Sequence, residues 1–176
     1  MDELALLVEK AKAKAGDSES FAGLYEQVAD DLYRMALYTL GNAQDAQDAV
    51  AETFMEAYRG LASLRDNTAF RAWILRILSF RCKRKIRQYI KERGTMDIDE
   101  LSSLSDDSSP EELGISRADL VRALGQLSAA EREIVLLSVL HGYTTREIAG
   151  IVGAPQGTVS SKLHRTLKKL RQQLGA

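Results

Sequence analysis

Apolar residues recur every three or four positions through much of the chain, which is the spacing of an amphipathic helix packed on a core. Three such segments, residues 21–36, 43–61 and 69–93, precede a stretch without this periodicity. The chain has no good run of alternating strand-like residues and only two prolines. The pattern therefore predicts an all-α protein whose residues 1–93 form an N-terminal helical domain.

The stretch that breaks the periodicity covers residues 94–116. Its first part, residues 94–113, is rich in serine and holds seven acidic residues and no basic one. Such weakly apolar, charged composition is typical of a flexible linker. We expect an acidic flexible linker with a short helical piece near residues 98–104. It divides the chain into two small helical domains, the second covering residues 117–176.

The second domain carries clear signals for the starts and ends of helices. Ser128 and Glu131 have the spacing of a capping box, in which side chain and backbone satisfy each other's hydrogen bonds at a helix start. Thr144 and Glu147 repeat this spacing, and a glycine follows each of the two helices. Short helices joined by a few residues that include glycine are typical of a helix-turn-helix. We predict that fold for the C-terminal domain.

The last helix of this domain, residues 157–174, holds five Lys or Arg residues and no acid. Its apolar residues fall on one stripe at about 100° per residue. Opposite the stripe, or at its flank, lie Ser160, Ser161, His164, Arg165 and Lys168. Such a helix could be a solvated surface, lie on a membrane, or enter a DNA groove.

The composition of the stripe bears on this choice. It is narrow, aliphatic and without Trp or Phe anchors, which argues against a membrane surface. In a helix-turn-helix the second helix enters the major groove with its N-terminal residues against base edges. Arg can pair with guanine and Ser with several groove partners, while Lys suits phosphates. We favour groove binding over the solvated face.

The formal net charge of −1 hides a strong segregation of charge along the chain. Residues 26–56 hold seven acids and one base, whereas residues 71–93 hold nine bases and one acid. A single charged run is often only a solvated face. Several runs of alternating sign favour separate surfaces for different partners, two of them polyanionic.

The overall composition limits the class of protein and its cellular compartment. The composition, 45% hydrophobic and 28% charged residues, is typical of a globular protein. One cysteine, Cys82, excludes an internal disulfide and fits a reducing cytoplasm. The N-terminus lacks the basic start of a signal peptide, and no apolar run reaches the roughly 20 residues of a membrane helix. We expect a cytoplasmic protein without membrane insertion.

No catalytic constellation is present in the sequence. The two histidines, His141 and His164, lie far apart, and there is no metal-ligand spacing, phosphate-binding glycine loop or nucleophile motif. We therefore expect no enzyme, no catalytic residue, no metal and no cofactor. The open alternatives are a stand-alone regulator that binds duplex operator DNA, usually as a symmetric dimer, and a helical protein-interaction module.

Two stretches of the sequence resemble one known family. "GNAQDAQDAVAETFMEAYRGLASLRDNTAFRAWILRI" and, after the linker, "LSAAEREIVLLSVLHGYTTREIAGIVGAPQGTVSSKLHRTLKKLRQQL" strongly resemble the extracytoplasmic-function (ECF) sigma factors, the minimal two-domain group of the bacterial sigma-70 family. The resemblance runs from about Phe21 to Leu174. It implies a protein that binds core RNA polymerase and directs transcription initiation by reading the −35 and −10 promoter elements and assisting DNA melting. An anti-sigma factor is then an expected partner.

The resemblance also implies roles for individual residues. The polymerase-binding residues would be Asp45, Asp48, Glu52 and Glu56. The residues at the −10 element would be Leu64, Arg65, Asp66, Asn67, Thr68, Arg76, Phe80, Arg81 and Arg84, the first five forming a loop that captures a flipped base. The residues that read the −35 element would be Ser160, Ser161, His164 and Arg165, with Lys168 suited to phosphate. These residues form the outward face of the last helix that was deduced above.

The sequence departs from the family pattern on the helix after Trp73. Relatives usually have Asn and Asp where this chain has Phe80 and Arg84. A phenylalanine can stack on a base but cannot make the hydrogen bonds of an asparagine. Trp73 itself shares an apolar stripe and is assigned to the core rather than to base stacking. For Cys82, flanking cations would lower the pKa of a redox-active thiol, but a structural thiol is the favoured interpretation.

The acidic linker and the three candidate functions each predict a different behaviour on DNA. We hypothesise that the acidic linker covers a basic face of the free protein until polymerase separates the domains. A sigma factor should bind promoter DNA well only with core polymerase and should favour an unpaired −10 strand. A stand-alone regulator would bind a duplex operator without polymerase, and an interaction module would show no sequence preference.

Overall fold

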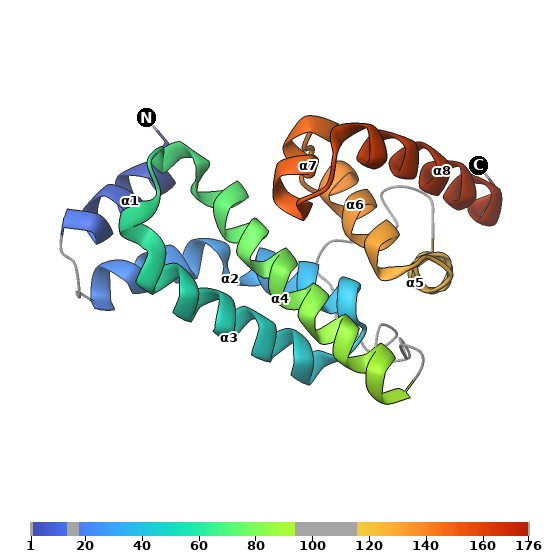
Figure 1. Ribbon diagram of the computed structural model, residues 1–176, viewed down its shortest axis with the longest axis horizontal. Helices are drawn as coiled ribbons and strands as arrows, with labels where there is room; N and C mark the ends of the chain where they lie inside the picture. The colour runs from blue at the N-terminus through green and yellow to red at the C-terminus, as the bar shows by residue number, and fades with distance from the viewer. Residues whose placement is uncertain (1, 14–17, 94–115, 176) are drawn as a thin grey trace.

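The computed structural model describes residues 2–13, 18–93 and 116–175, and all regular structure in these ranges is helical (Figure 1). The elements are α1 (Glu3–Ala13), α2 (Ser18–Leu40), α3 (Ala43–Gly60), the 3₁₀ turns η1 (Leu61–Ser63) and η2 (Asn67–Ala69), α4 (Phe70–Arg93), α5 (Arg117–Gly125), α6 (Ala129–Val139), α7 (Thr145–Val152) and α8 (Gln156–Leu174). The all-α prediction is confirmed. The predicted linker, apart from its last residue, lies outside the described residues, as do its expected helical piece and its hypothesised role.

Helices α2, α3 and α4 correspond to the three periodic segments of the sequence. Each buries one apolar face, to which Leu32 of α2, Phe54 of α3 and Ile74 of α4 contribute. Burying one such side chain stabilises the fold by about 1.5–3 kcal/mol. Gly41, at a φ of 69°, ends α2, and the Asn42 side chain caps α3.

Helix α1 was not predicted. It buries Leu4, Ala5, Val8 and Ala11, a spacing that places all four on one face. The helix packs against α2 and against η2, just before α4 begins. The apolar spacing of residues 4–11 was the available signal for this helix.

The C-terminal half contains α5 to α8. Both predicted capping boxes are present: the Ser128 hydroxyl accepts from the Glu131 amide at 3.2 Å, and the Glu131 carboxylate accepts from the Ser128 amide at 3.0 Å. Thr144 and Glu147 make the same reciprocal pair at the start of α7. Gly153, at a φ of 72°, ends α7 and lets the chain turn into α8. Helices α7 and α8 are the predicted helix-turn-helix.

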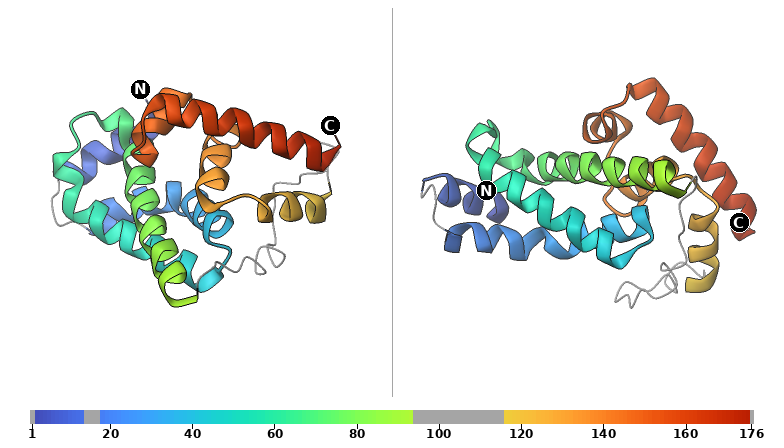
Figure 2. Two further views of the ribbon diagram at one scale, coloured as in Figure 1. Left: turned by 45° about the vertical axis from the view of Figure 1, so that its right-hand side comes forward. Right: turned by 60° about the horizontal axis from the view of Figure 1, so that its bottom comes forward.

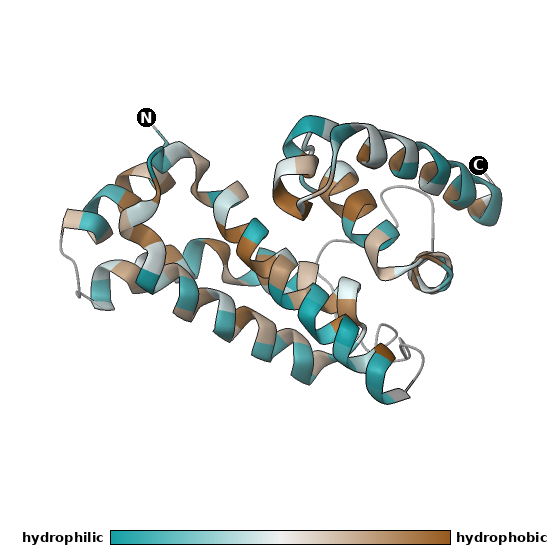
Figure 3. Cartoon of the chain, in the orientation of Figure 1, coloured by the Kyte–Doolittle hydropathy of each residue, from teal (hydrophilic) through white to brown (hydrophobic). Residues whose placement is uncertain are grey.

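The two halves pack directly on each other. Helix α2 lies against α6, and α4 crosses α7 (Figure 2). The apolar core is continuous across this boundary, from Leu78 of α4 to Leu137 of α6 and Ile148 of α7. Helices α3 and α8 lie on opposite sides of the molecule in this view, and apolar and polar residues alternate around both (Figure 3). These two helices carry much of the charge discussed below.

Candidate nucleic-acid interface

Helix α8 presents the polar face that the sequence predicted. Val159, on the opposite side, is fully buried against the preceding helices. Ser161, His164, Arg165 and Lys168 are exposed, and Ser160 is half-buried. The side chains are thus placed where a major groove could meet them, near the N-terminal half of the second helix of the helix-turn-helix.

A polar contact fixes α8 on α6. Thr166 is fully buried, and its hydroxyl lies 2.7 Å from the Lys162 carbonyl oxygen and 3.2 Å from a carboxylate oxygen of Glu131. Lys169 donates to the same carboxylate at 3.0 Å. Burial opposes ionisation of Glu131, but hydrogen bonds from Ser128 and Lys169 outweigh it and lower its pKa to about 2. This cluster attaches the Thr166 side of α8 to α6.

The same cluster borders a hollow between the start of α6 and α8. It is lined by Ser128, Glu131, Lys162, Arg165 and Lys169. Three of these side chains are cationic, which suits a DNA phosphate. The three cations come from α8, whereas Ser128 and Glu131 belong to the start of α6, so the hollow forms only when the two helices pack.

The loop between α3 and α4 holds the predicted base-capture residues together. Leu64 is buried, whereas Arg65, Asp66 and Thr68 are exposed and Asn67 is half-buried. Asp66 accepts from the Thr68 amide at 3.0 Å and from its hydroxyl at 2.6 Å. These hydrogen bonds, with the nearby charge of Lys12, hold the pKa of Asp66 below its usual value. The loop therefore has an internal anchor and an exposed rim.

A residue outside the predicted set also contacts this loop. The ammonium group of Lys12, at the end of α1, donates to the Leu64 carbonyl oxygen and to Oδ1 of Asn67, the latter at 2.6 Å. Lys12 is half-buried. It lies 52 and 55 residues before its two partners, so no local spacing in the sequence indicated the contact.

Helix α4 carries an exposed stripe of cations around an aromatic ring. Arg76, Phe80 and Arg84 are all exposed, and a spacing of four residues places them on one side of the helix. The Phe80 side chain is 57% exposed. A ring flanked by cations suits the stacking of unpaired bases near phosphates.

Arg81, predicted to contact DNA, is directed toward α3 instead. Its guanidinium donates to Glu56 at 2.8 Å and lies 3.7 Å from Glu52. Lys85 lies 3.9 Å from Glu52. Two of the four acids predicted to bind polymerase are therefore paired with α4. The other two, Asp45 and Asp48, are half-buried near the start of α3.

Trp73 packs with the core, as predicted. Its ring centroid lies 5.9 Å from that of Phe70, which is fully buried. A Cβ atom on Gly60 would lie 3.5 Å from the indole ring. The half-buried indole therefore packs against the end of α3.

The redox interpretation of Cys82 is wrong. The side chain is 3% exposed, and burial raises the pKa of its thiol well above the usual value. The neighbouring cations were expected to have the opposite effect, but Arg81 and Lys83 on either side are turned toward Glu56 and toward the Val152 carbonyl oxygen of α7. Cys82 is a structural thiol, which was the favoured alternative.

Charged side chains are buried where the two halves meet. Arg132 of α6 is 1% exposed and donates to the Thr39 carbonyl oxygen of α2 at 2.8 Å. Its other contacts are the carbonyl oxygens of Leu124 and Leu127, at 3.4 and 3.3 Å. Burial lowers the pKa of Arg132 to about 10 and raises that of the adjacent Glu133 above its usual value.

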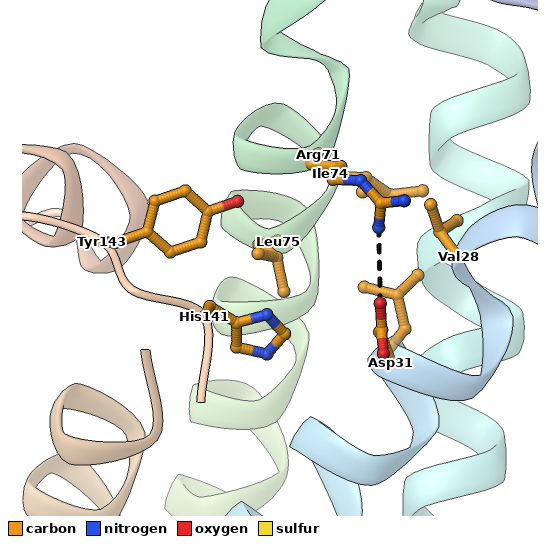
Figure 4. Close-up of a pocket in the computed structure, with 8 residues that line it drawn as sticks. Val28, Asp31, Arg71, Ile74, Leu75, His141 and Tyr143 are labelled. Atoms are coloured by element: carbon orange, nitrogen blue, oxygen red, sulfur yellow. Dashed lines mark hydrogen bonds and ion pairs between the residues drawn. The ribbon is translucent and has the colours of Figure 1, made fainter. Parts of the chain in front are cut away.

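A small pocket opens beside this boundary (Figure 4). His141 and Tyr143 face Leu75 of α4, and Arg71 pairs with Asp31 of α2 at 3.3 Å. Burial lowers the pKa of His141. The lining is formed by both halves of the molecule, so the pocket depends on their packing.

Within ranges 2–13, 18–93 and 116–175, no helix has the length and apolarity to cross a membrane. In the same ranges no three His, Cys, Asp or Glu side chains are grouped so as to hold a metal ion.

Comparisons with known proteins define the class. Residues 24–91 match the family model of sigma-70 region 2, and residues 117–170 match that of sigma-70 region 4. The chain is 31% identical to the ECF RNA polymerase sigma factor SigL of Mycobacterium tuberculosis, covering 93% of this chain and 95% of that protein. It is 28% identical to SigW of Bacillus subtilis, covering 93% of both.

Solved structures share the fold. The sigma factor RpoE of Bartonella quintana, in complex with the anti-sigma factor NepR, matches with a TM-score of 0.70 at 24% identity, over 90% of this chain and 98% of that one. CnrH, in complex with the cytosolic domain of CnrY, matches with a TM-score of 0.69 at 23% identity, over 99% of this chain and 98% of that one. Both likenesses concern the arrangement of helices.

The helical fold, the basic helix-turn-helix and the two matched regions define a sigma-70-type transcription initiation factor. Within that class the chain belongs to the ECF sigma factors. It acts in promoter-directed transcription initiation with RNA polymerase and promoter DNA. None of the relatives named above favours a stand-alone regulator.

Proposed function

We propose that the two halves of this sigma factor read the two promoter elements separately. Residues 117–176 form the domain that reads the −35 element, residues 1–93 form the domain that binds polymerase and the −10 element, and residues 94–116 link them. The observation that carries the proposal is the outward face of α8, where Ser161, His164, Arg165 and Lys168 are exposed while Val159 is buried. Base contacts fall to Ser160, Ser161, His164 and Arg165, and Lys168 holds phosphate.

At the −10 element, the loop of residues 64–68 captures a base extruded from the duplex. The exposed groups of Arg65 and Thr68 and the half-buried amide of Asn67 provide polar edges beside the apolar Leu64. Arg76, Phe80 and Arg84 then follow the unpaired strand along α4. Phe80 is 57% exposed and so accessible to an unpaired base, which supports a stacking role. Arg81 acts indirectly, by holding α4 on α3.

Polymerase is bound by the acidic side of α3, where Asp45, Asp48, Glu52 and Glu56 face a basic partner surface. The pairs of Arg81 and Lys85 with Glu52 and Glu56 do not oppose this role. The side chains of Glu52 and Glu56 remain 42% and 46% exposed, and exposed ion pairs contribute only about 0–1 kcal/mol each. A partner can share or displace them.

The protein acts in the cytoplasm and has no catalytic activity of its own, as expected of an initiation factor. An anti-sigma factor binds it and keeps it from polymerase. Two proteins of the same fold, CnrH and RpoE, were solved with CnrY and with the anti-sigma factor NepR, which supports a partner of that kind here.

Run-off transcription from random promoter libraries tests the proposal. Core polymerase is used with the wild-type chain, with Arg165→Ala, and with no sigma factor. We expect new start sites that are preceded by two spaced sequence elements. Arg165→Ala should alter the base preference at the upstream element and leave the other element unchanged. Starts that depend on one element, or an Arg165→Ala variant with unchanged preferences, would overturn the assignment of the two halves.

A further inference from the structure

Lys12 lies in a helix upstream of both matched family regions, yet it contacts the loop assigned to base capture. Helix α1 ends at Ala13, and the region 2 match begins at residue 24. The four buried residues of α1 fix the helix on the N-terminal core. Its packing against η2 carries Lys12 to the loop. The position of Lys12 is therefore set by a packed helix and not by a free terminus.

The contact joins the two ends of the loop. The Lys12 ammonium donates to the Leu64 carbonyl oxygen before the turn and to Oδ1 of Asn67 after it. Hydrogen bonds from a charged donor are stronger than neutral ones. Asp66, which lies between these two points, accepts hydrogen bonds from the amide and the hydroxyl of Thr68. The loop is thus held by one long-range bridge from α1 and by one cap within the loop.

The bridge also decides which end of the Asn67 amide is available to a ligand. An ammonium group has three donors and no acceptor, so only the oxygen of the amide can face Lys12. The Nδ2 group is left with its two donors. Within the described residues it makes no hydrogen bond, and it is not among the buried atoms that lack a partner. The loop therefore presents the N–H donors of Asn67 outward, while its amide oxygen is turned toward Lys12.

We propose that Lys12 is a positioning residue for promoter recognition, which orients Asn67 so that the loop selects its captured base through an acceptor atom on the base edge. The inference rests on the proposed role of residues 64–68 at the −10 element. A base that presents a ring nitrogen or carbonyl oxygen at this point pairs with Nδ2, whereas one that presents an amino group meets a second donor and is rejected. Lys12 itself contacts no base.

The test uses the full chain in holoenzyme, on promoters randomised across the −10 element. Lys12→Met removes the charge at similar length, and Lys12→Arg keeps donors that can reach both oxygens. Asn67→Asp keeps an oxygen toward Lys12 and removes the outward donors. Lys10→Met is the matched control, because Lys10 is an exposed cation on the same helix.

Lys12→Met and Asn67→Asp should each reduce the base preference by about tenfold, at the same single −10 position. Combining them should add nothing. Lys12→Arg should restore the preference, and Lys10→Met should leave it unchanged, with the −35 preference constant throughout. A base preference at the −10 element that is retained in Lys12→Met would overturn the inference. A loss of transcription that is equal for every −10 sequence and is not rescued by Lys12→Arg would overturn it as well. A wild-type chain without any −10 preference would instead contradict the proposed function itself.

Discussion

Arg132 of α6 binds the backbone of Thr39 of α2, with the guanidinium 2.8 Å from the carbonyl oxygen, and so joins the two halves of the molecule through a buried charge. The same side chain reaches the carbonyl oxygens of Leu124 and Leu127, where α5 ends. One arginine therefore ties together three segments. Charge-assisted hydrogen bonds of this kind are worth more than neutral ones when buried.

Arg132→Ala should lower the free energy of unfolding by about 3 kcal/mol, since it removes buried packing and leaves carbonyl oxygens without their donor. Denaturant unfolding of the two proteins measures the difference. Arg122→Ala serves as the control, because that side chain is 70% exposed and pairs with Asp119 at 3.1 Å. An exposed pair contributes about 0–1 kcal/mol. Equal losses in the two variants would contradict the role given to Arg132.

The pKa of Glu131 predicts an acid sensitivity of the contact between α6 and α8. Because folding lowers this pKa from 4.5 to about 2, the unfolded chain binds the proton more readily. The stabilisation is therefore present above pH 4.5 and is lost as the pH falls through 2. The contribution amounts to about 2–3 kcal/mol.

Glu131→Gln tests this sign, since glutamine retains the capping box but cannot ionise. The variant should be less stable than wild type at pH 7 by about 2–3 kcal/mol, with the difference shrinking towards pH 2. Lys169→Met, which removes the partner of Glu131, should show part of the same effect. A difference independent of pH would mean that the carboxylate charge contributes nothing.

Arg165 and Lys168 should differ in what their loss does to promoter binding. Arg165→Ala should weaken recognition at one or two bases of the −35 element by about 1–3 kcal/mol. Lys168→Ala should weaken all sequences alike and reduce the slope of log affinity against log salt by about 1. Holoenzyme binding to a panel of single-base −35 variants distinguishes them. Uniform weakening by Arg165→Ala would assign Arg165 to phosphate.

Phe80→Ala should weaken holoenzyme binding to an unpaired −10 strand by about 1–3 kcal/mol, the value of one stacked base. Stability should change by less than about 0.5 kcal/mol, because the ring is on the surface. Ile90→Ala is the matched control, being 55% exposed on the same helix. Fluorescence anisotropy with a labelled oligonucleotide measures the binding of both variants. If the two variants bind equally well, stacking by Phe80 is refuted.

Much of this protein follows from local signals in its sequence. Periodicity predicted α2, α3 and α4, and two capping boxes predicted the starts of α6 and α7. The direction of α8 followed from its apolar stripe, because Val159 must be buried for the domain to have a core. Each of these features depends on residues within a turn or two of one another, so a short stretch of sequence contains all the residues that interact.

The tertiary structure decided the contacts between distant segments. Arg81 could have faced DNA or the acids of α3, and its pairing with Glu56, 25 residues away, depends on how α3 and α4 cross. Burial reversed the expected shift in the pKa of Cys82, because the charge of neighbours in sequence matters less than the loss of water. The reach of Lys12 to Asn67 and of Arg132 to Thr39 likewise arises only when helices pack. Periodicity shows that a helix has an inner face, but only packing determines which residue of another helix meets it.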